Sequence, residues 1–266
     1  MPVLVSKSLR DYRRALVGWA IGITAFCGMY LSFYPSMTRN PEVYGQAALA
    51  KFPGAMRDLM GGMEDFTSGV GYLHSVVYQL FGPMLFVVCA AILGNRALAQ
   101  PEESGTLELT LTLPIDRRRL VFERFAALAL GLLGLAVVTF LVVWALTAAV
   151  GLNVAPDRIL AGHTGILLLG LFFGTLALTV GAAAGRRNIA MAVVGVAVVG
   201  GYVIETLGRD VDAIAWLRWV SPFHYYLDGR PLHQGFPTGD YLILAGATVV
   251  LLLTAILAFD RRDVGV

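Results

Sequence analysis

Residues 125–156 read FAALALGLLGLAVVTFLVVWALTAAVGLNVAP, an uninterrupted run of 32 residues without a charged side chain. An α-helix rises about 1.5 Å per residue, so roughly 20 apolar residues cross the hydrocarbon core of a bilayer, which is about 30 Å thick. A run of this length and composition predicts a transmembrane helix.

Further charge-free runs lie on both sides of this one, at residues 15–38, 66–95, 159–185, 188–204 and 241–259. Together the six runs contain 149 of the 266 residues. Over the whole chain 57% of the residues are hydrophobic and only 14% are charged, whereas soluble domains have about 25% charged residues. This composition excludes an ordinary soluble enzyme.

We therefore predict an all-α membrane protein with six transmembrane helices, which form a single transmembrane domain over residues 1–266. The predicted spans cover approximately residues 15–36, 74–95, 125–152, 162–185, 188–207 and 240–259. Cys27 and Cys89 both fall within spans, so they predict neither a disulfide framework nor a thiolate metal site.

The distribution of Lys and Arg predicts which side of the membrane each loop faces. Six spans place both termini on the same side, and 13 of the 20 Lys and Arg residues then fall on that side. Because cytoplasmic loops carry an excess of these residues, we predict a multi-pass protein of the plasma membrane with both termini cytoplasmic. No block of basic and aromatic residues indicates nucleic acid as a partner.

Two segments next to the spans have the pattern of helices at a membrane surface. At the N-terminus, an apolar helix face lies opposite a basic one, which predicts an interfacial helix. The residues of the two faces are Val5, Leu9, Tyr12 and Leu16, and Lys7, Arg10 and Arg14. Between spans five and six, residues 213–219 and 223–227 are rich in Trp and Tyr, which predicts two short interfacial helices. Glu205 and Asp228 nearby are interpreted as solvent-facing acids or as acids facing a polar outer vestibule.

Span four carries glycines at intervals of four, seven and four residues, which places them on one helix face. They are Gly170, Gly174, Gly181 and Gly185. Small residues let transmembrane helices approach closely, so we predict that this face packs against another helix. A role in lining a pore is the alternative.

The segment from Pro101 to Arg124 is the largest predicted cytoplasmic element. Pro114 disfavours helix in the residue before it and divides the segment, and Asp116 is a good N-cap for a helix that continues into span three. In the first part, leucines alternate with polar residues over 106–113, which is the period of a strand. An isolated strand would have no pairing partner in this chain, so periodicity leaves this part undecided.

Several short motifs occur in a characteristic order along the chain. Between spans two and three lie Glu103, Gly105, Thr106, Leu107, Glu108, Leu111, Leu113, Pro114 and the run Arg117 to Leu120. Residues 9–35 contain Arg13-Arg14, Gly18-Trp19 and Tyr34-Pro35, and residues 221–226 read SPFHYY. In this order the motifs resemble the permease subunits of ABC exporters of the second type, the ABC type 2 transporter permease family.

The resemblance implies roles for individual residues. It implies a coupling helix between spans two and three that touches an ATP-binding subunit, through Glu103, Gly105, Thr106, Leu107, Glu108, Leu111, Pro114, Arg117 and Arg118. It also implies short re-entrant outer helices between spans five and six. The residues it places along a substrate path are Tyr78, Gln79 and Asn95 on span two and Tyr202 on span five. A solvated charged loop is the alternative interpretation of the inner segment.

The chain lacks the sequence elements of an ATP site. A phosphate-binding loop requires G-x-x-x-x-G-K followed by Ser or Thr, and Lys7 and Lys51 are the only lysines. If the resemblance holds, ATP and Mg²⁺ belong to a separate ATP-binding cassette subunit, expected in two copies, and this chain is a transport subunit rather than an enzyme. We predict no catalytic residues, no metal ligands and no cofactor in this chain, and a second permease, as a homodimer.

The predicted path is nearly free of charge, which favours an amphipathic or apolar cargo such as an antibiotic or drug. The expected activity is efflux from the cytoplasm by alternating access, of the kind that gives multidrug resistance. An ion-coupled secondary transporter is an alternative, but such carriers usually bury an ionisable residue in mid-span and the spans show none. An intramembrane hydrolase is a further alternative, although none of the four histidines lies in an H-E-x-x-H motif.

Overall fold

The computed structural model describes residues 3–44, 50–51, 66–79, 81–107, 116–209 and 211–262. All regular structure in these ranges is helical, and they contain no strand. Six helical stretches are long and apolar enough to cross a membrane, which confirms the predicted fold class. These stretches are Leu4–Thr38, Gly69–Ala97, Arg117–Ala149, Pro156–Ala184, Arg187–Leu207 and Thr238–Arg261.

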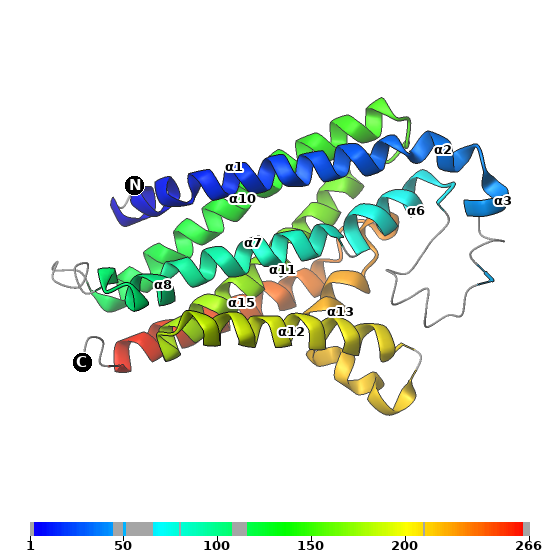
Figure 1. The fold of residues 1–266 in the computed structure, drawn as a ribbon. Helices are drawn as coiled ribbons and strands as arrows, with labels where there is room; N and C mark the ends of the chain where they lie inside the picture. Colours follow the sequence, from blue (N-terminus) through cyan, green and yellow to red (C-terminus); the bar gives the residue numbers. More distant parts are fainter. Residues whose placement is uncertain are drawn as a thin grey trace.

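The long helices run side by side, and both ends of the chain lie at the same end of the bundle (Figure 1). The spans are built from α1 (Val3–Ser32) with α2 (Tyr34–Thr38), α6 (Gly69–Leu73) with the π-helix η1 (His74–Gln79) and α7 (Phe81–Ala97), α10 (Arg117–Ala149), α11 (Pro156–Ala184), α12 (Arg187–Leu207) and α15 (Thr238–Arg261). We call the end with the termini the inner end and the opposite end the outer end.

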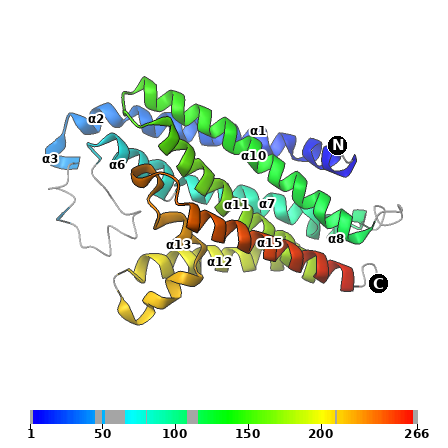
Figure 2. The same cartoon turned by 180° about the vertical axis from the view of Figure 1, so that it is seen from behind.

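Short helices occupy the connections. They are α3 (Pro41–Tyr44), α8 (Ala99–Glu103), the 3-10 helix η2 (Asp212–Val220), α13 (Pro222–Leu227) and α14 (Pro231–Gln234). α8 lies at the inner end, and η2, α13 and α14 lie at the outer end, as both views show (Figures 1 and 2). η2 and α13 coincide with the two short helices predicted between spans five and six.

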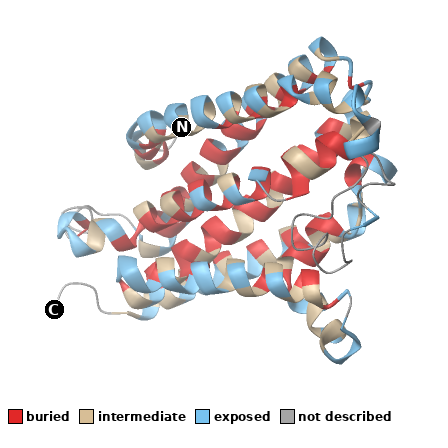
Figure 3. Ribbon diagram, turned by 45° about the vertical axis from the view of Figure 1, so that its right-hand side comes forward, coloured by how far each residue is buried: buried red, intermediate tan, exposed pale blue. Residues whose placement is uncertain are grey.

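α11 is the central helix of the bundle and contacts α7, α15, α10 and α12. Side chains along it, such as Leu169, Phe173 and Ala177, are fully buried. Figure 3 shows buried positions gathered in the middle of the bundle and exposed positions along its outside. Large apolar side chains lie on this outside, including Val196 and Leu242, as expected of helices that face lipid or another membrane protein.

The glycines of span four face α7 and α8. A Cβ at Gly170 or Gly174 would lie 3.8 or 3.2 Å from the Cβ of Ala90, and one at Gly181 would lie 3.2 Å from that of Ala99. Gly185 differs from the prediction because it lies just past the end of α11. It has a φ of +63° and is the C-cap of that helix, and glycine adopts this left-handed conformation without steric cost.

The separate interfacial helix predicted at the N-terminus is wrong, because α1 is one continuous helix from Val3 to Ser32. Its buried positions form one stripe along the whole length, from Val5 and Tyr12 through Ile23 and Cys27 to Leu31. α1 packs against α10, so the apolar face of the N-terminal segment continues the packed face of the span. No proline or helix-ending glycine motif interrupts it.

α10 begins eight residues earlier than the predicted span, at Arg117. The Asp116 side chain accepts a hydrogen bond from the backbone N–H of Arg118 at 3.0 Å, which confirms Asp116 as the N-cap. The charged turn that follows it is therefore helical, because a capped helix start satisfies donors that would otherwise be left without a partner.

Candidate functional site

The inner end of the bundle holds the segment interpreted as a coupling region. α8 follows directly on α7, and the chain turns at Gly105, which has a φ of +70°. The Thr106 hydroxyl donates to the carbonyl of Pro101 at 3.2 Å and lies 2.9 Å from the Ser104 hydroxyl oxygen. These contacts close the end of α8. Leu107 is then fully buried beside Leu120, Leu178 and Phe259.

The two acids of α8 bond to other helices of the same chain. Oε1 of Glu103 accepts a hydrogen bond from the backbone N–H of Arg187 at 2.8 Å. Arg187 is at the N-terminus of α12, where a negative charge complements the helix dipole. Glu102 forms an ion pair with Arg262. Arg262 also donates to the carbonyl of Ala182 at 3.0 Å. α8 is thus joined to the start of α12 and, through Arg262, to the chain after α15 and the end of α11.

The start of α10 is joined to the same place. Arg118 donates to Asp260 of α15 through Nε at 3.0 Å and Nη2 at 2.8 Å. Arg117 donates from Nη1 to the carbonyl of Arg262 at 2.8 Å. We call this set of contacts the inner junction. It comprises Glu102, Glu103, Arg117, Arg118, Asp260 and Arg262, with the backbone of Ala182 and Arg187.

Six of the residues proposed for coupling lie at the inner end of the molecule: Glu103, Gly105, Thr106, Leu107, Arg117 and Arg118. Of these, Glu103, Arg117 and Arg118 belong to the inner junction. Glu108, Leu111 and Pro114 lie outside the residues that the structure describes. In the alternating stretch 106–113, Thr106 and Leu107 are helical, and the remaining residues lie outside the described ranges. Sequence reasoning assigned the charges of this region to a docked partner, whereas Glu102, Glu103 and Arg118 each have a partner within the chain.

The four residues proposed for a substrate path are not brought together at one site. Tyr78 and Gln79 lie in the π-helix η1, and Asn95 lies 16 residues further along the same span, which is about 24 Å of helix. The Tyr78 hydroxyl lies 2.6 Å from Nδ1 of His163 on α11. Tyr202 meets the ring of Phe223 edge to face. A shared path along these residues remains a prediction.

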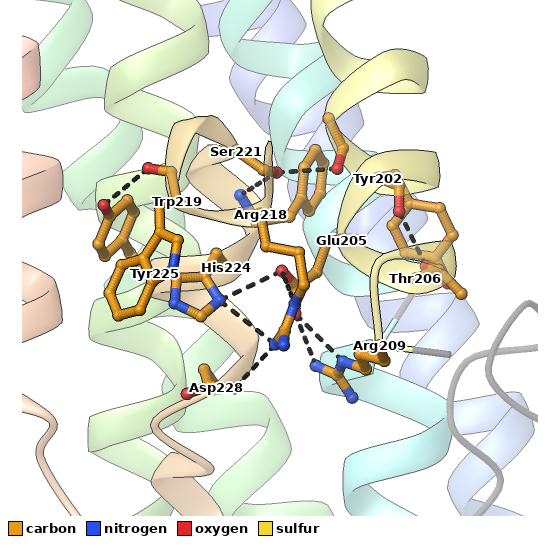
Figure 4. Close-up of polar contacts among 12 residues, drawn as sticks. Tyr202, Glu205, Thr206, Arg209, Arg218, Trp219, Ser221, His224, Tyr225 and Asp228 are labelled. Carbon is orange, nitrogen blue, oxygen red and sulfur yellow. Dashed lines mark hydrogen bonds and ion pairs between the residues drawn. The ribbon is translucent and has the colours of Figure 1, made fainter. Parts of the chain in front are cut away.

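The outer end holds a cluster of charges around a completely buried carboxylate, Glu205 at the end of α12 (Figure 4). Glu205 accepts hydrogen bonds from Arg209 at 2.9 and 3.1 Å and from Arg218 of η2 at 3.0 and 3.2 Å. Nδ1 of His224, on α13, lies 3.2 Å from its Oε2. Arg218 also donates to Asp228 at 3.1 Å. We call these five residues the outer ion-pair cluster.

The interpretation of Glu205 as a solvent-facing acid is wrong, since its side chain is 0% exposed. Asp228 is exposed, at 55% of its side chain. A buried carboxylate is stable only when cations and hydrogen bonds replace its water, and Arg209 and Arg218 supply both. The hydrogen bond to Glu205 raises the pKa of the Arg218 guanidinium above its ordinary value, so Arg218 stays charged.

Glu205, His224 and Asp228 are also residue types that ligate metals, and their ligand atoms lie within 4.8 Å of one another. Arg218 occupies the same space, because one of its nitrogens, Nη2, bonds to both carboxylates. The positive charge that a metal would supply is therefore already present as a guanidinium. The arrangement fits an ion-pair network better than a metal centre.

The cluster is positioned by contacts between α12 and α13. The Ser221 hydroxyl donates to the carbonyl of Gly201 at 2.8 Å and accepts the backbone N–H of Phe223 at 3.2 Å, so that it caps α13 and ties it to α12. Tyr225 donates to the carbonyl of Trp219 at 2.8 Å. The capping role of Ser221 could be predicted from the sequence, because Ser followed by Pro is typical of the start of a helix. No local signal could reveal that α12, η2 and α13 converge on Glu205.

Comparison with known proteins agrees with this architecture. A family model described as "ABC-2 family transporter protein" matches residues 3–264, nearly the whole chain. No curated protein matches the chain. Six membrane-crossing stretches, a short α8 between the second and third, and short helices between the fifth and sixth lie within the matched residues. The chain therefore belongs to the ABC-2 family of transporter proteins.

Proposed function

We propose that this chain is the permease subunit of an ATP-driven ABC exporter, which moves an amphipathic or apolar compound out of the cytoplasm by alternating access. Membership of the ABC-2 family implies an ATP-binding partner. ATP and Mg²⁺ are bound there, and the partner is present in two copies. Antibiotics and other drugs fit the proposed cargo, since the spans carry few charges.

The observation that carries this proposal furthest is the inner junction. A helix displaced by a partner subunit can move a span only if the two are joined. α8 bonds to the start of α12 through Glu103 and to Arg262, next to α15, through Glu102. A push on the coupling segment therefore reaches two spans directly. A second permease, proposed to be a copy of this chain, completes the path, because exposed apolar side chains remain along the outer faces of α12 and α15.

Glu103→Gln tests this coupling role. The substitution removes the charge at the N-terminus of α12 and keeps the side chain's size. The charge contributes up to about 1 kcal/mol at a helix terminus, so we expect ATP-dependent efflux to fall about fivefold. The measurement is dye efflux from proteoliposomes that hold the permease and its ATP-binding subunit, with ATP hydrolysis recorded in parallel.

Glu42→Gln is the matched control, because it makes the same change at an exposed acid of α3 at the outer end. It should leave efflux unchanged. Hydrolysis that continues while efflux falls in Glu103→Gln would indicate lost coupling. If both variants pump equally well, Glu103 has no part in coupling. If efflux persists without the ATP-binding subunit, the proposed mechanism is wrong.

The proposed orientation has both termini in the cytoplasm. Cys27 and Cys89 are both buried, so a membrane-impermeant maleimide should report on introduced cysteines alone. We expect Arg39→Cys, at the outer end, to be labelled in intact cells, and Arg10→Cys, at the inner end, only after permeabilisation. Both positions are exposed in the structure. The reverse labelling pattern would invert the topology.

A further inference from the structure

A hollow of about 430 Å³ lies at the inner end between α1, α7, α8 and the first turns of α10. Its polar lining comprises Lys7, Asp11, Tyr12, Arg96, Gln100, Ser104, Thr106 and Arg124. We call it the inner basic hollow. Lys7, Arg96 and Arg124 are cations and Asp11 is the single acid among these lining residues, so the hollow carries an excess of positive charge.

Arg124 is the cation of the hollow that most needs an anionic partner, because its guanidinium is buried. Its residue is only 9% exposed. Nη1 donates to the Ser8 hydroxyl at 3.0 Å, and Nε has no hydrogen-bond acceptor among the described residues. A guanidinium so far removed from water is costly unless an anion and further hydrogen bonds compensate it. Asp11, the acid of the hollow, is exposed, and Arg124 has no carboxylate partner within the described part of the chain.

The combination of a buried guanidinium, two more cations and neutral hydrogen-bonding groups suits a phosphate ester. Guanidinium groups bind phosphate oxygens through paired, charge-assisted hydrogen bonds. Gln100 and Ser104 offer partners for hydroxyl groups beside the phosphate. The volume exceeds that of a phosphate alone and has room for a glycerol phosphate.

Past Arg14, the surface of α1 on the side of Lys7 is apolar, which favours a lipid as the source of the phosphate. Gly18 and Ile21 lie 11 and 14 residues after Lys7, and the 100° helical step places them within about 40° of it on the wheel. A Cβ at Gly18 would meet nothing within 4 Å, and Ile21 is 65% exposed. An acyl chain can therefore lie along α1 above a headgroup held in the hollow.

We propose that the inner basic hollow binds the phosphate of an anionic phospholipid, with Arg124, Arg96 and Lys7 as its cations. Basic pockets between transmembrane helices on the cytoplasmic side bind such headgroups in other membrane proteins. The choice of the cytoplasmic leaflet rests on the proposed orientation, but the binding itself does not depend on ATP-driven export.

The test is binding of phosphatidylglycerol to the full-length chain in detergent, measured by native mass spectrometry without an ATP-binding subunit. The variant is Lys7→Gln with Arg96→Gln, which leaves the buried Arg124 in place. Each cation near a membrane surface contributes about fivefold to the affinity for an anionic lipid, so the double variant should bind about 25-fold more weakly. Arg186→Gln with Arg261→Gln is the matched control, since it removes two exposed cations of the inner end that do not line the hollow.

The control variant should bind phosphatidylglycerol as tightly as the unsubstituted chain does. Both of these proteins should bind phosphatidylcholine more weakly than phosphatidylglycerol. Equal loss in the two double variants would overturn the proposal, because it would indicate general surface attraction. Equal binding of the two lipids would overturn it as well. If an equal concentration of inorganic phosphate displaces phosphatidylglycerol, the ligand of the hollow is free phosphate and the proposed lipid is wrong. If it does not, the result supports a lipid phosphate as the ligand.

Discussion

Glu205→Gln should destabilise the protein by about 3–5 kcal/mol, the cost typical of removing one partner from a buried ion pair. The variant keeps the shape of the side chain but leaves the guanidinium groups of Arg209 and Arg218 facing a neutral amide at a fully buried position. Both arginines donate hydrogen bonds to the same carboxylate, so the loss affects η2 and α12 together. For a chain of this length, a loss of that size lowers the melting temperature by about 10 °C, which thermal unfolding in detergent should show.

Asp228→Asn is the matched control, because Asp228 also pairs with Arg218 but is largely exposed. Exposed pairs contribute about 1 kcal/mol or less, so its melting temperature should stay within about 3 °C of the unsubstituted protein. Combining Glu205→Gln with Arg218→Gln should cost less than the sum of the two single changes. If Glu205→Gln and Asp228→Asn have the same melting temperature, the buried carboxylate of Glu205 does not stabilise the outer end more than an exposed ion pair does.

Gly94→Ala should disrupt a close contact between α7 and α11. A Cβ at Gly94 of α7 would overlap the carbonyl oxygen of Gly174 on α11 and lie 3.0 Å from the Cβ of Ala177. The obstacle is backbone, which cannot rotate away, so the two helices must separate. Overpacking of this kind costs about 3 kcal/mol, and we expect a lower melting temperature and a smaller yield of monodisperse protein in detergent.

Gly134→Ala on α10 separates this effect from the general consequences of replacing glycine. A Cβ at Gly134 would meet nothing within 4 Å, and alanine favours helix over glycine by about 1 kcal/mol. This control should be as stable as the unsubstituted protein or slightly more so. Equal melting temperatures for the two variants would show that α7 and α11 do not depend on their close approach at Gly94.

The parts of the fold that were predicted correctly depend on local composition. A run of about 17 or more apolar residues that crosses a bilayer forms a helix, because every backbone group has to be satisfied within its own segment. The six spans therefore follow from the charge-free runs. Asp116 could be identified in the same way, because an N-cap depends only on the residues next to it.

The errors concern contacts between segments distant in the chain. The N-terminal pattern of α1 fits an interfacial helix equally well, and packing against α10 decided between the two. Glu205 looked like an exposed acid because Arg218 and His224, which surround it, come from η2 and α13. A close pair such as Arg118 and Asp260, 142 residues apart, has no counterpart in any local pattern.

The amino-acid sequence by itself determined that this protein is a six-span helical membrane protein, because hydrophobicity and helix length act over a few turns of chain. Its motif order was also sufficient to indicate the ABC-2 family. Only the tertiary structure decided which charges are paired, buried or left facing a hollow. That depends on which helix ends meet, and a carboxylate or guanidinium becomes an ion-pair partner or an anion site only once packing has removed it from water.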